Sequence, residues 1–119
     1  MKDLNEKERE VILKKRMEAP FLNAYYLLED EGTYHCKQCD QALFSSASKF
    51  HSGSGWPCFD DAIDDQVREI TNKEVGKTEA FCSACNGFLG YVYMGENFTE
   101  RQKRYNISSL ALRFKPNLF

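Results

Sequence analysis

The chain has little proline, no long apolar run and no excess of basic charge. Its 119 residues include 3 prolines and 7 glycines, too few for a collagen-like or disordered chain. The 16 lysines and arginines are outnumbered by 18 aspartates and glutamates, so binding to nucleic acid through phosphate neutralisation is not expected. No apolar run approaches the roughly 20 residues of a membrane-spanning helix, and the charged first ten residues are unlike a signal peptide. We therefore expect a cytoplasmic protein that binds neither nucleic acid nor membranes.

The length predicts a single domain over residues 1–119, and a hydrophobic content of 42% is enough to fill one core. Residues 3–17 place apolar side chains among charged ones at helical spacing, and Ala19-Pro20 should end that helix. Asp3 and Glu6 have the spacing of a capping box at its start. The sequence thus begins with a predicted amphipathic helix.

The rest of the chain has the alternating pattern and turn residues of short strands. Strands are predicted at residues 33–36, 66–70, 78–82, 89–93 and 109–114, with turns at 83–84, at 95–97 and around residue 103. The serine- and glycine-rich residues 45–55 read as a loop. The pattern predicts a mainly β, mostly antiparallel domain, either a small barrel or a sandwich.

Four of the five cysteines form two C-x-x-C pairs, Cys36/Cys39 and Cys82/Cys85, separated by 42 residues. In a reducing compartment such pairs indicate metal ligation more often than disulfides. Four thiolates complete a tetrahedral shell, which predicts one structural zinc ion per chain with no open position for catalysis. The alternatives are buried cysteines that pack as small apolar side chains, or one redox-active pair.

The only tryptophan lies in the segment Ser52–Phe59, where glycines precede Trp56 and Pro57 follows it. A flexible backbone that leads to a large ring next to a φ-restricted proline suits the wall of a small apolar pocket. The alternative is a core tryptophan beside a surface loop.

From Ala19 to Pro116 the chain resembles the methionine-R-sulfoxide reductase B family. The matching segments, in family order, are Gly32–Cys36, Ala42–Ser46, Lys49-Phe50, Ser52–Pro57 with Phe59, Lys77–Glu79, Cys82–Cys85, Leu89-Gly90 and Arg104-Tyr105. The resemblance implies two antiparallel sheets and a structural zinc held by four cysteines. It also implies an activity in which a cysteine attacks the sulfoxide sulfur while the tryptophan holds the substrate methyl group.

The resemblance fails at three positions that carry this chemistry. The family's attacking cysteine directly follows the Arg-Tyr pair, where this chain has Asn106, and no cysteine occurs after Cys85. The two histidines expected around the Leu-Gly pair are replaced by Phe88 and Tyr91. An amide cannot attack sulfur as a thiolate does.

Two functions of different classes remain open, and the departures favour the first. It is a zinc-containing protein without catalysis that binds methionine sulfoxide or a methionine-containing peptide through Trp56, Arg104, Asn106 and Tyr91. The alternative is an active peptide-methionine (R)-S-oxide reductase that uses Cys58 as nucleophile, although Cys58 can equally be a small buried side chain. A third interpretation, a pocket filled by the protein's own side chains, would leave only an interaction surface.

Overall fold

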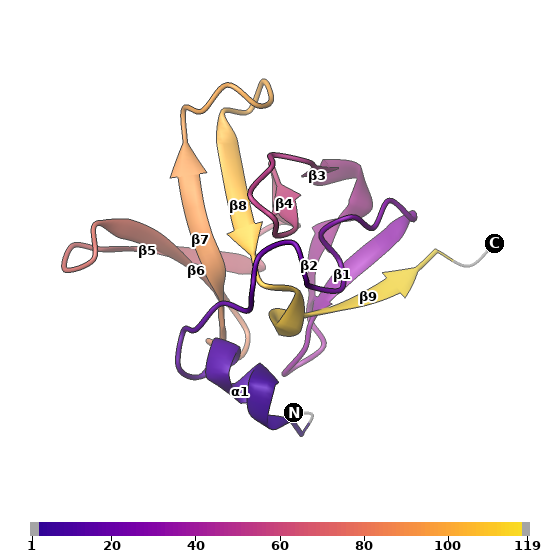
Figure 1. The fold of residues 1–119 in the computed structure, drawn as a ribbon, viewed down its shortest axis with the longest axis vertical. Helices are drawn as coiled ribbons and strands as arrows, with labels where there is room; N and C mark the ends of the chain where they lie inside the picture. Colours follow the sequence, from indigo (N-terminus) through magenta and orange to yellow (C-terminus); the bar gives the residue numbers. More distant parts are fainter. Residues whose placement is uncertain (1–2, 118–119) are drawn as a thin grey trace.

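The computed structural model describes residues 3–117, which form two antiparallel sheets preceded by one short helix (Figure 1). This arrangement confirms the predicted mainly β fold. In chain order the elements are α1 (Glu6–Ile12), β1 (Gly32–Cys36), β2 (Ala42–Ser45), η1 (Ser46–Ser48), β3 (Lys49–Phe50), β4 (Cys58–Phe59), β5 (Val67–Asn72), β6 (Lys77–Cys82), β7 (Phe88–Met94), β8 (Lys103–Ile107), η2 (Ser109–Ala111) and β9 (Leu112–Pro116).

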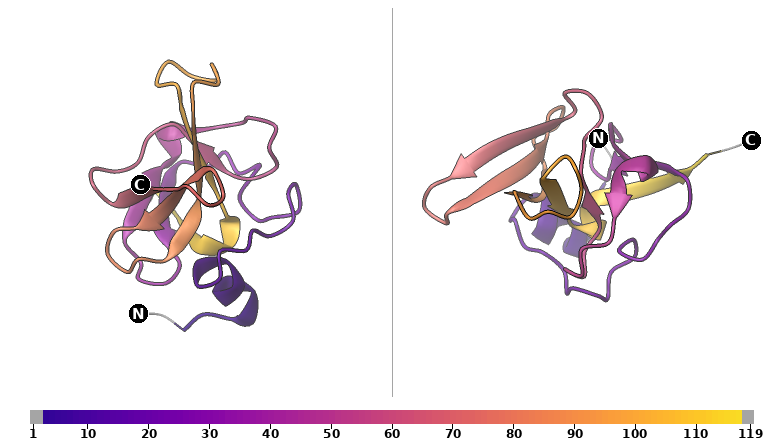
Figure 2. Two further views of the ribbon diagram at one scale, coloured as in Figure 1. Left: turned by 90° about the vertical axis from the view of Figure 1, so that its left-hand side faces the viewer. Right: turned by 90° about the horizontal axis from the view of Figure 1, so that it is seen from above.

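The smaller sheet has the strand order β2-β1-β9, and the larger one has the order β3-β4-β8-β7-β6-β5. Between β8 and β9 the chain passes from the larger sheet to the smaller one through η2. The β5–β6 hairpin extends away from the other strands in the right-hand view of Figure 2. The two sheets meet near the inner strands β1, β4 and β8, where aromatic rings of one sheet contact those of the other. These strands also carry residues of the candidate site.

The helix is shorter than predicted and begins at a different capping box. The N-cap is Asn5, whose side chain accepts a hydrogen bond from the Glu8 amide, while the Glu8 carboxylate accepts one from the Asn5 amide. Asp3 and Glu6 were thus the wrong pair. The helix ends at Ile12, ahead of Lys15, whose positive φ of 59° is incompatible with a continued helix. Within residues 3–117 no helix is long and apolar enough to cross a membrane.

Two strand predictions need correction. Residue 103, predicted as a turn, begins strand β8. Residues 109–111, predicted as part of a strand, form the 3₁₀ helix η2 before β9 starts at Leu112. Strand β8 is difficult to recognise from the sequence because most of its side chains are polar. Only Tyr105 and Ile107 are apolar there, whereas Arg104 and Asn106 occupy the alternate positions.

Aromatic rings from both sheets form the core. The ring of Phe44 on β2 stacks on Phe59 of β4 with centroids 4.4 Å apart, and Tyr34 of β1 meets Phe59 edge-on at 5.0 Å. Tyr105 of β8 adds a contact to Phe44 at 5.4 Å. Since successive side chains of a strand point to opposite faces, burial of Phe59 and Tyr105 in this core directs their neighbours to the other face of the larger sheet.

Candidate functional site

The four paired cysteines converge from two similar turns. Cys36 closes β1 and Cys82 closes β6, while Cys39 and Cys85 lie in the turns that follow. The four Sγ atoms all lie within 4.8 Å of one another, with 3.6 Å between Cys36 and Cys85 and 3.5 Å between Cys39 and Cys82. The structure therefore brings together the four predicted ligands.

Both turns have the same backbone geometry. The amide of Asp40 donates to the carbonyl of Cys36 at 2.8 Å, and the amide of Asn86 donates to that of Cys82 at the same distance. Asp40 and Asn86 both have a positive φ, 70° and 65°. Each turn thus presents two sulfur atoms to a common centre.

The cluster fits a zinc ion. A tetrahedral site with zinc–sulfur bonds of about 2.3 Å has sulfur–sulfur edges of about 3.8 Å, close to the observed spacing. The hydrogen bond from Cys36 lowers the pKa of Cys82 to about 5, whereas the same bond and then burial raise the pKa of Cys36. Four thiolates this close repel one another unless a cation lies between them. The four cysteines would hold one structural zinc ion and leave no coordination position for a substrate.

A second group of polar side chains lies in a row across the larger sheet. Tyr91 of β7 pairs directly with Asn106 of β8, which pairs directly with Cys58 of β4. Cys58 is completely buried and Asn106 is 4% exposed. The Asn106 Oδ1 atom accepts hydrogen bonds from Ser54 Oγ and Arg104 Nη1, both at 2.8 Å, and from Cys58 Sγ at 3.4 Å.

Arg104 contacts this row and is not a solvated arginine at a strand end. Its side chain is 11% exposed, its Nε donates to Glu96 Oε1 at 2.8 Å, and its guanidinium lies 4.4 Å from the centre of the Tyr93 ring. Its Nη1 lies 3.7 Å from Cys58 Sγ. Burial by itself would lower the pKa of Arg104, but the hydrogen bonds to Glu96 and Cys58 outweigh burial and raise it. A fixed positive charge therefore lies beside the Cys58 sulfur.

Phe88 and Tyr91, which replace the two histidines of the resemblance, pack as an aromatic pair. Their ring centroids are 5.4 Å apart, and Phe88 is almost completely buried. The ammonium group of Lys77 lies 4.6 Å from the centre of the Tyr91 ring. The hydrogen-bond partners of the Cys58 sulfur given above do not include Tyr91.

The half-buried Trp56 is held by an N-terminal strap, residues 18–28. The indole Nε1 donates to the Glu18 carbonyl at 3.0 Å. The Gly55 carbonyl accepts from the Phe21 amide at 2.8 Å and from Asn23 Nδ2 at 2.7 Å. Gly55 has a φ of +88°, and a Cβ atom there would lie 2.7 Å from the Phe21 amide nitrogen. Only glycine allows the strap to lie this close to the tryptophan loop.

Trp56 borders a hollow of about 340 Å³, referred to below as the Trp56 hollow. The other lining residues come from the strap, from Glu29 just after it, and from the glycine-rich loop. They are Tyr26, Leu27, Glu29, His51, Ser52, Gly53 and Gly55. Arg104, Asn106 and Tyr91, which were expected at this pocket, are not among the residues that line it. Ser52 connects the two places, because its Oγ lies 3.1 Å from Cys58 Sγ. The hollow is thus separated from the Cys58 sulfur by one serine side chain.

The sequence did not identify the polar rim of the hollow. His51 Nε2 lies 3.1 Å from Glu29 Oε1, and both side chains are exposed. The position of His51 just before the glycine-rich loop was a usable signal, whereas nothing in the sequence places the strap residues Tyr26 and Leu27 beside Trp56.

The comparisons with known proteins agree with this geometry. The family described as the SelR domain matches residues 4–116. The peptide methionine sulfoxide reductase MsrB of Methanosarcina barkeri is 40% identical over 117 residues, covering 96% of this chain and 82% of that protein. The Leptospira interrogans protein of the same name is 36% identical over 117 residues, covering 96% and 88%.

Plant relatives are longer. Peptide methionine sulfoxide reductase B3 of Arabidopsis thaliana is 32% identical over 114 residues, and the match spans 95% of this chain but 65% of that protein. Among solved structures, the Mis18 "Yippee-like" domain shares the fold, with a TM-score of 0.58 over 75% of this chain and 99% of that domain at 21% sequence identity. On the match over residues 4–116 and the two microbial relatives, the chain belongs to the SelR domain family, that of the methionine sulfoxide reductases B.

Proposed function

We propose that this protein is a peptide-methionine (R)-S-oxide reductase in which Cys58 supplies the attacking sulfur. The observation that carries the proposal is the position of Cys58 Sγ, 3.4 Å from the side chain of Asn106 on the adjacent strand. By resemblance, Asn106 stands where the family has its attacking cysteine. The sulfur is displaced by one strand but stays in the same row and on the same face of the sheet.

Three polar groups lie beside the Cys58 sulfur. Arg104 Nη1 lies 3.7 Å away, and the hydroxyl groups of Ser52 and Ser54 lie 3.1 and 3.4 Å away. The thiolate is the attacking form of a cysteine, and Arg104 places a positive charge beside this sulfur. Arg104 and Ser52 can also donate hydrogen bonds to an oxygen atom bound to the sulfur, whereas the Ser54 hydroxyl already donates to Asn106 Oδ1.

The reaction is a two-electron reduction of the sulfoxide. The Cys58 thiolate bonds to the sulfoxide sulfur, and the oxygen takes up one proton from solvent. The oxygen then passes to Cys58 Sγ as the substrate's sulfur–oxygen bond and the transient sulfur–sulfur bond both break. The substrate leaves as the thioether, and Cys58 carries the oxygen as a sulfenic acid. One external thiol then forms a mixed disulfide with Cys58 and releases water, and a second thiol displaces Cys58 as the free thiol. The external reductant is required because the other four cysteines form the metal cluster.

Access to the sulfur requires movement of the glycine-rich loop. Cys58 is completely buried beneath Ser52 and Ser54, whereas Gly53 between them has open space around it and a φ of +84°. Displacement of this short segment would connect the Trp56 hollow with the Cys58 sulfur. Trp56 and the hollow would hold the methionine side chain during the reaction.

The experiment compares turnover of R and S methionine sulfoxide peptides by the zinc-loaded protein with dithiothreitol as reductant. We expect reduction of the R epimer, and its loss in Cys58→Ser with zinc content and melting temperature retained. No turnover of the R epimer by the wild-type protein, or unchanged turnover in Cys58→Ser, would contradict the proposal.

A second candidate function, binding without catalysis, is favoured by the complete burial of Cys58. It keeps the Trp56 hollow as the site for a methionine-like side chain. Because the chain has one tryptophan, its fluorescence reports on Trp56 alone. A saturable fluorescence change with a methionine sulfoxide peptide, together with no turnover, would identify this second function.

A further inference from the structure

The rim of the Trp56 hollow carries one carboxylate, that of Glu29. The Glu29 side chain lines the hollow and is 79% exposed. Asp30 and Glu31 follow it directly and are exposed as well. A ligand that enters the hollow from solvent therefore meets the Glu29 carboxylate.

The nearby basic groups do not cancel this charge. His51 pairs with Glu29 at 3.1 Å, but this is an ion pair only when the imidazole is protonated. The ammonium group of the half-buried Lys49 donates to the carbonyl oxygens of Tyr26 and Leu28, at 3.0 and 2.8 Å. Burial lowers the pKa of Lys49, and Cys58 and then Glu29 work against that effect. The Glu29 carboxylate thus has an imidazole as its partner at the rim, whereas the ammonium group of Lys49 is directed at backbone oxygens.

Apolar side chains extend the surface outward from the hollow. Phe21 of the strap is 53% exposed and Leu27 is 64% exposed. Side chains of this kind can pack against the aliphatic stem of a lysine or arginine while its charged group reaches a carboxylate. The surface beside the hollow therefore combines an apolar floor with negative charge.

We propose that the Trp56 hollow and its acidic rim select polypeptide segments in which a lysine or arginine adjoins the methionine held in the hollow. The proposal rests on the function proposed above only in assigning a methionine-like side chain to the hollow. Glu29 would pair with the flanking cation, and Phe21 and Leu27 would contact its stem. An acidic residue beside the methionine would be repelled by the Glu29 carboxylate.

The test measures binding separately from turnover. Three capped peptides of equal length carry methionine sulfoxide flanked by lysine, by glutamine or by glutamate, and each is titrated against Trp56 fluorescence at low salt without reductant. Because a single exposed ion pair stabilises a complex only weakly, we expect the lysine peptide to bind about threefold more tightly than the glutamine peptide. The glutamate peptide should bind more weakly than both, and the difference should shrink in high salt.

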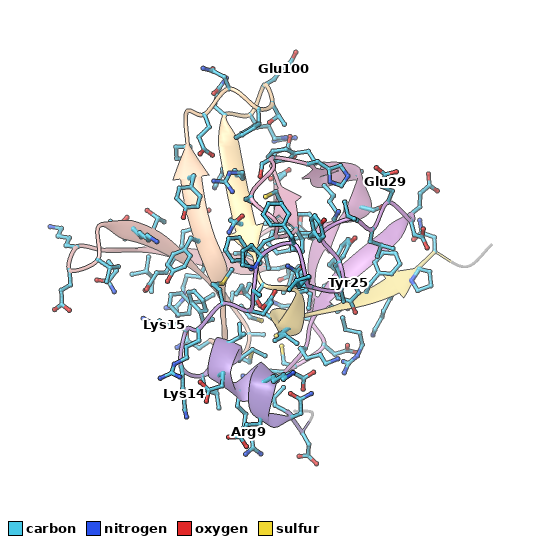
Figure 3. All side chains as sticks on the ribbon, in the orientation of Figure 1. Arg9, Lys14, Lys15, Tyr25, Glu29 and Glu100 are labelled. Carbon is cyan, nitrogen blue, oxygen red and sulfur yellow. The ribbon has the colours of Figure 1, made fainter. Side chains whose placement is uncertain are left out.

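The variants locate the effect. Glu29→Gln should remove most of the preference for lysine, and Glu29→Lys should reverse it. Glu100→Gln makes the same change in net charge at the tip of the β7–β8 hairpin, away from Glu29 in Figure 3, and should leave the preference unchanged. The same titrations with Cys58→Ser keep the measurement free of any chemical step.

Equal affinities for the three peptides, a preference that persists in Glu29→Gln, or no binding of any peptide would overturn the inference. The two proposals fail separately. A lysine preference without turnover contradicts the reductase function and leaves the rim's selectivity standing. Turnover at a rate that does not depend on the flanking charge supports the reductase function and contradicts the selectivity of the rim.

Discussion

The Sγ atom of Cys58 lies 3.4 Å from Oδ1 of Asn106, its direct partner across the β4–β8 pair. Directly opposed residues of an antiparallel pair share one face of the sheet with their Cβ atoms about 5 Å apart. A sulfur atom at either position therefore has nearly the same neighbours. Arg104 contacts both side chains, at 3.7 Å from the sulfur and 2.8 Å from the amide oxygen.

This relationship predicts that Asn106→Cys increases turnover of methionine-R-sulfoxide. The substitution places a thiol where Ser54 and Arg104 now donate hydrogen bonds to the amide oxygen. Both donors favour the thiolate. We expect a rate increase of roughly tenfold or more, which corresponds to about 1.4 kcal/mol of barrier. Asn106→Ser is the control, and equal rates for the two variants would contradict the prediction.

The cysteine cluster predicts that removal of one zinc ligand lowers the stability of the fold, because the free energy of metal binding contributes to the free energy of folding. Cys85→Ser should bind less than one zinc per chain and melt about 10 °C lower or more. Cys58→Ser is a matched control, since Cys58 lies outside the cluster. Elemental analysis and thermal denaturation, with and without a chelator, measure both quantities. Retention of zinc and melting temperature by Cys85→Ser would remove the structural role.

Short-range signals in the sequence predicted the metal cluster and most of the strands. The C-x-x-C spacing limits where two sulfur atoms can lie, so Cys36, Cys39, Cys82 and Cys85 were recognisable without the fold. The start of the helix was predicted wrongly because Asp3/Glu6 and Asn5/Glu8 have the same spacing, which does not distinguish the two pairs.

The Trp56 hollow could not be predicted from the sequence because it is formed by contacts between distant parts of the chain. The strap reaches Trp56 through the Glu18 carbonyl, which is 38 residues away in sequence. Nothing local in the strap indicates this contact. The proximity of Cys58 to Asn106 likewise required the pairing of β4 with β8, and β8 was itself missed at Lys103 because its polar residues hide the strand pattern.

Close approach of two strands predicts that Gly90→Ala is strongly destabilising. A Cβ atom at Gly90 would lie 2.1 Å from the Asn106 carbonyl oxygen and 2.9 Å from the Ile107 Cα, so β7 and β8 would have to separate. We expect a loss of about 3 kcal/mol or more in the free energy of unfolding. Gly95→Ala is the control, because its Cβ has open space and only the positive φ of 73°, worth about 1–2 kcal/mol, opposes it. Urea denaturation compares the two, and equal losses would contradict the clash.

The pairing of Glu69 with β8 predicts an acid-sensitive contribution to stability. Glu69 Oε2 accepts hydrogen bonds from Lys103 Nζ at 2.5 Å and from the Tyr105 hydroxyl at 2.7 Å. Burial alone would raise the pKa of Glu69, but the bonds from Lys103 and Tyr105 outweigh it and lower the pKa below its ordinary value of 4.5. The unfolded chain therefore binds this proton more readily than the folded one, and stability rises with pH through this interval.

The contribution of Glu69 is complete above about pH 4.5 and disappears as the pH falls through the lowered pKa of the folded protein. Glu69→Gln should therefore lower the melting temperature at pH 7 by about 3 °C and have less effect near pH 3. Glu74→Gln makes the same charge change at an exposed position between β5 and β6. Its effect should be smaller at pH 7, because the Glu74 side chain lies outside the pairing with Lys103 and Tyr105. A Glu69→Gln effect that is the same at both pH values would show that the pairing does not depend on the carboxylate charge.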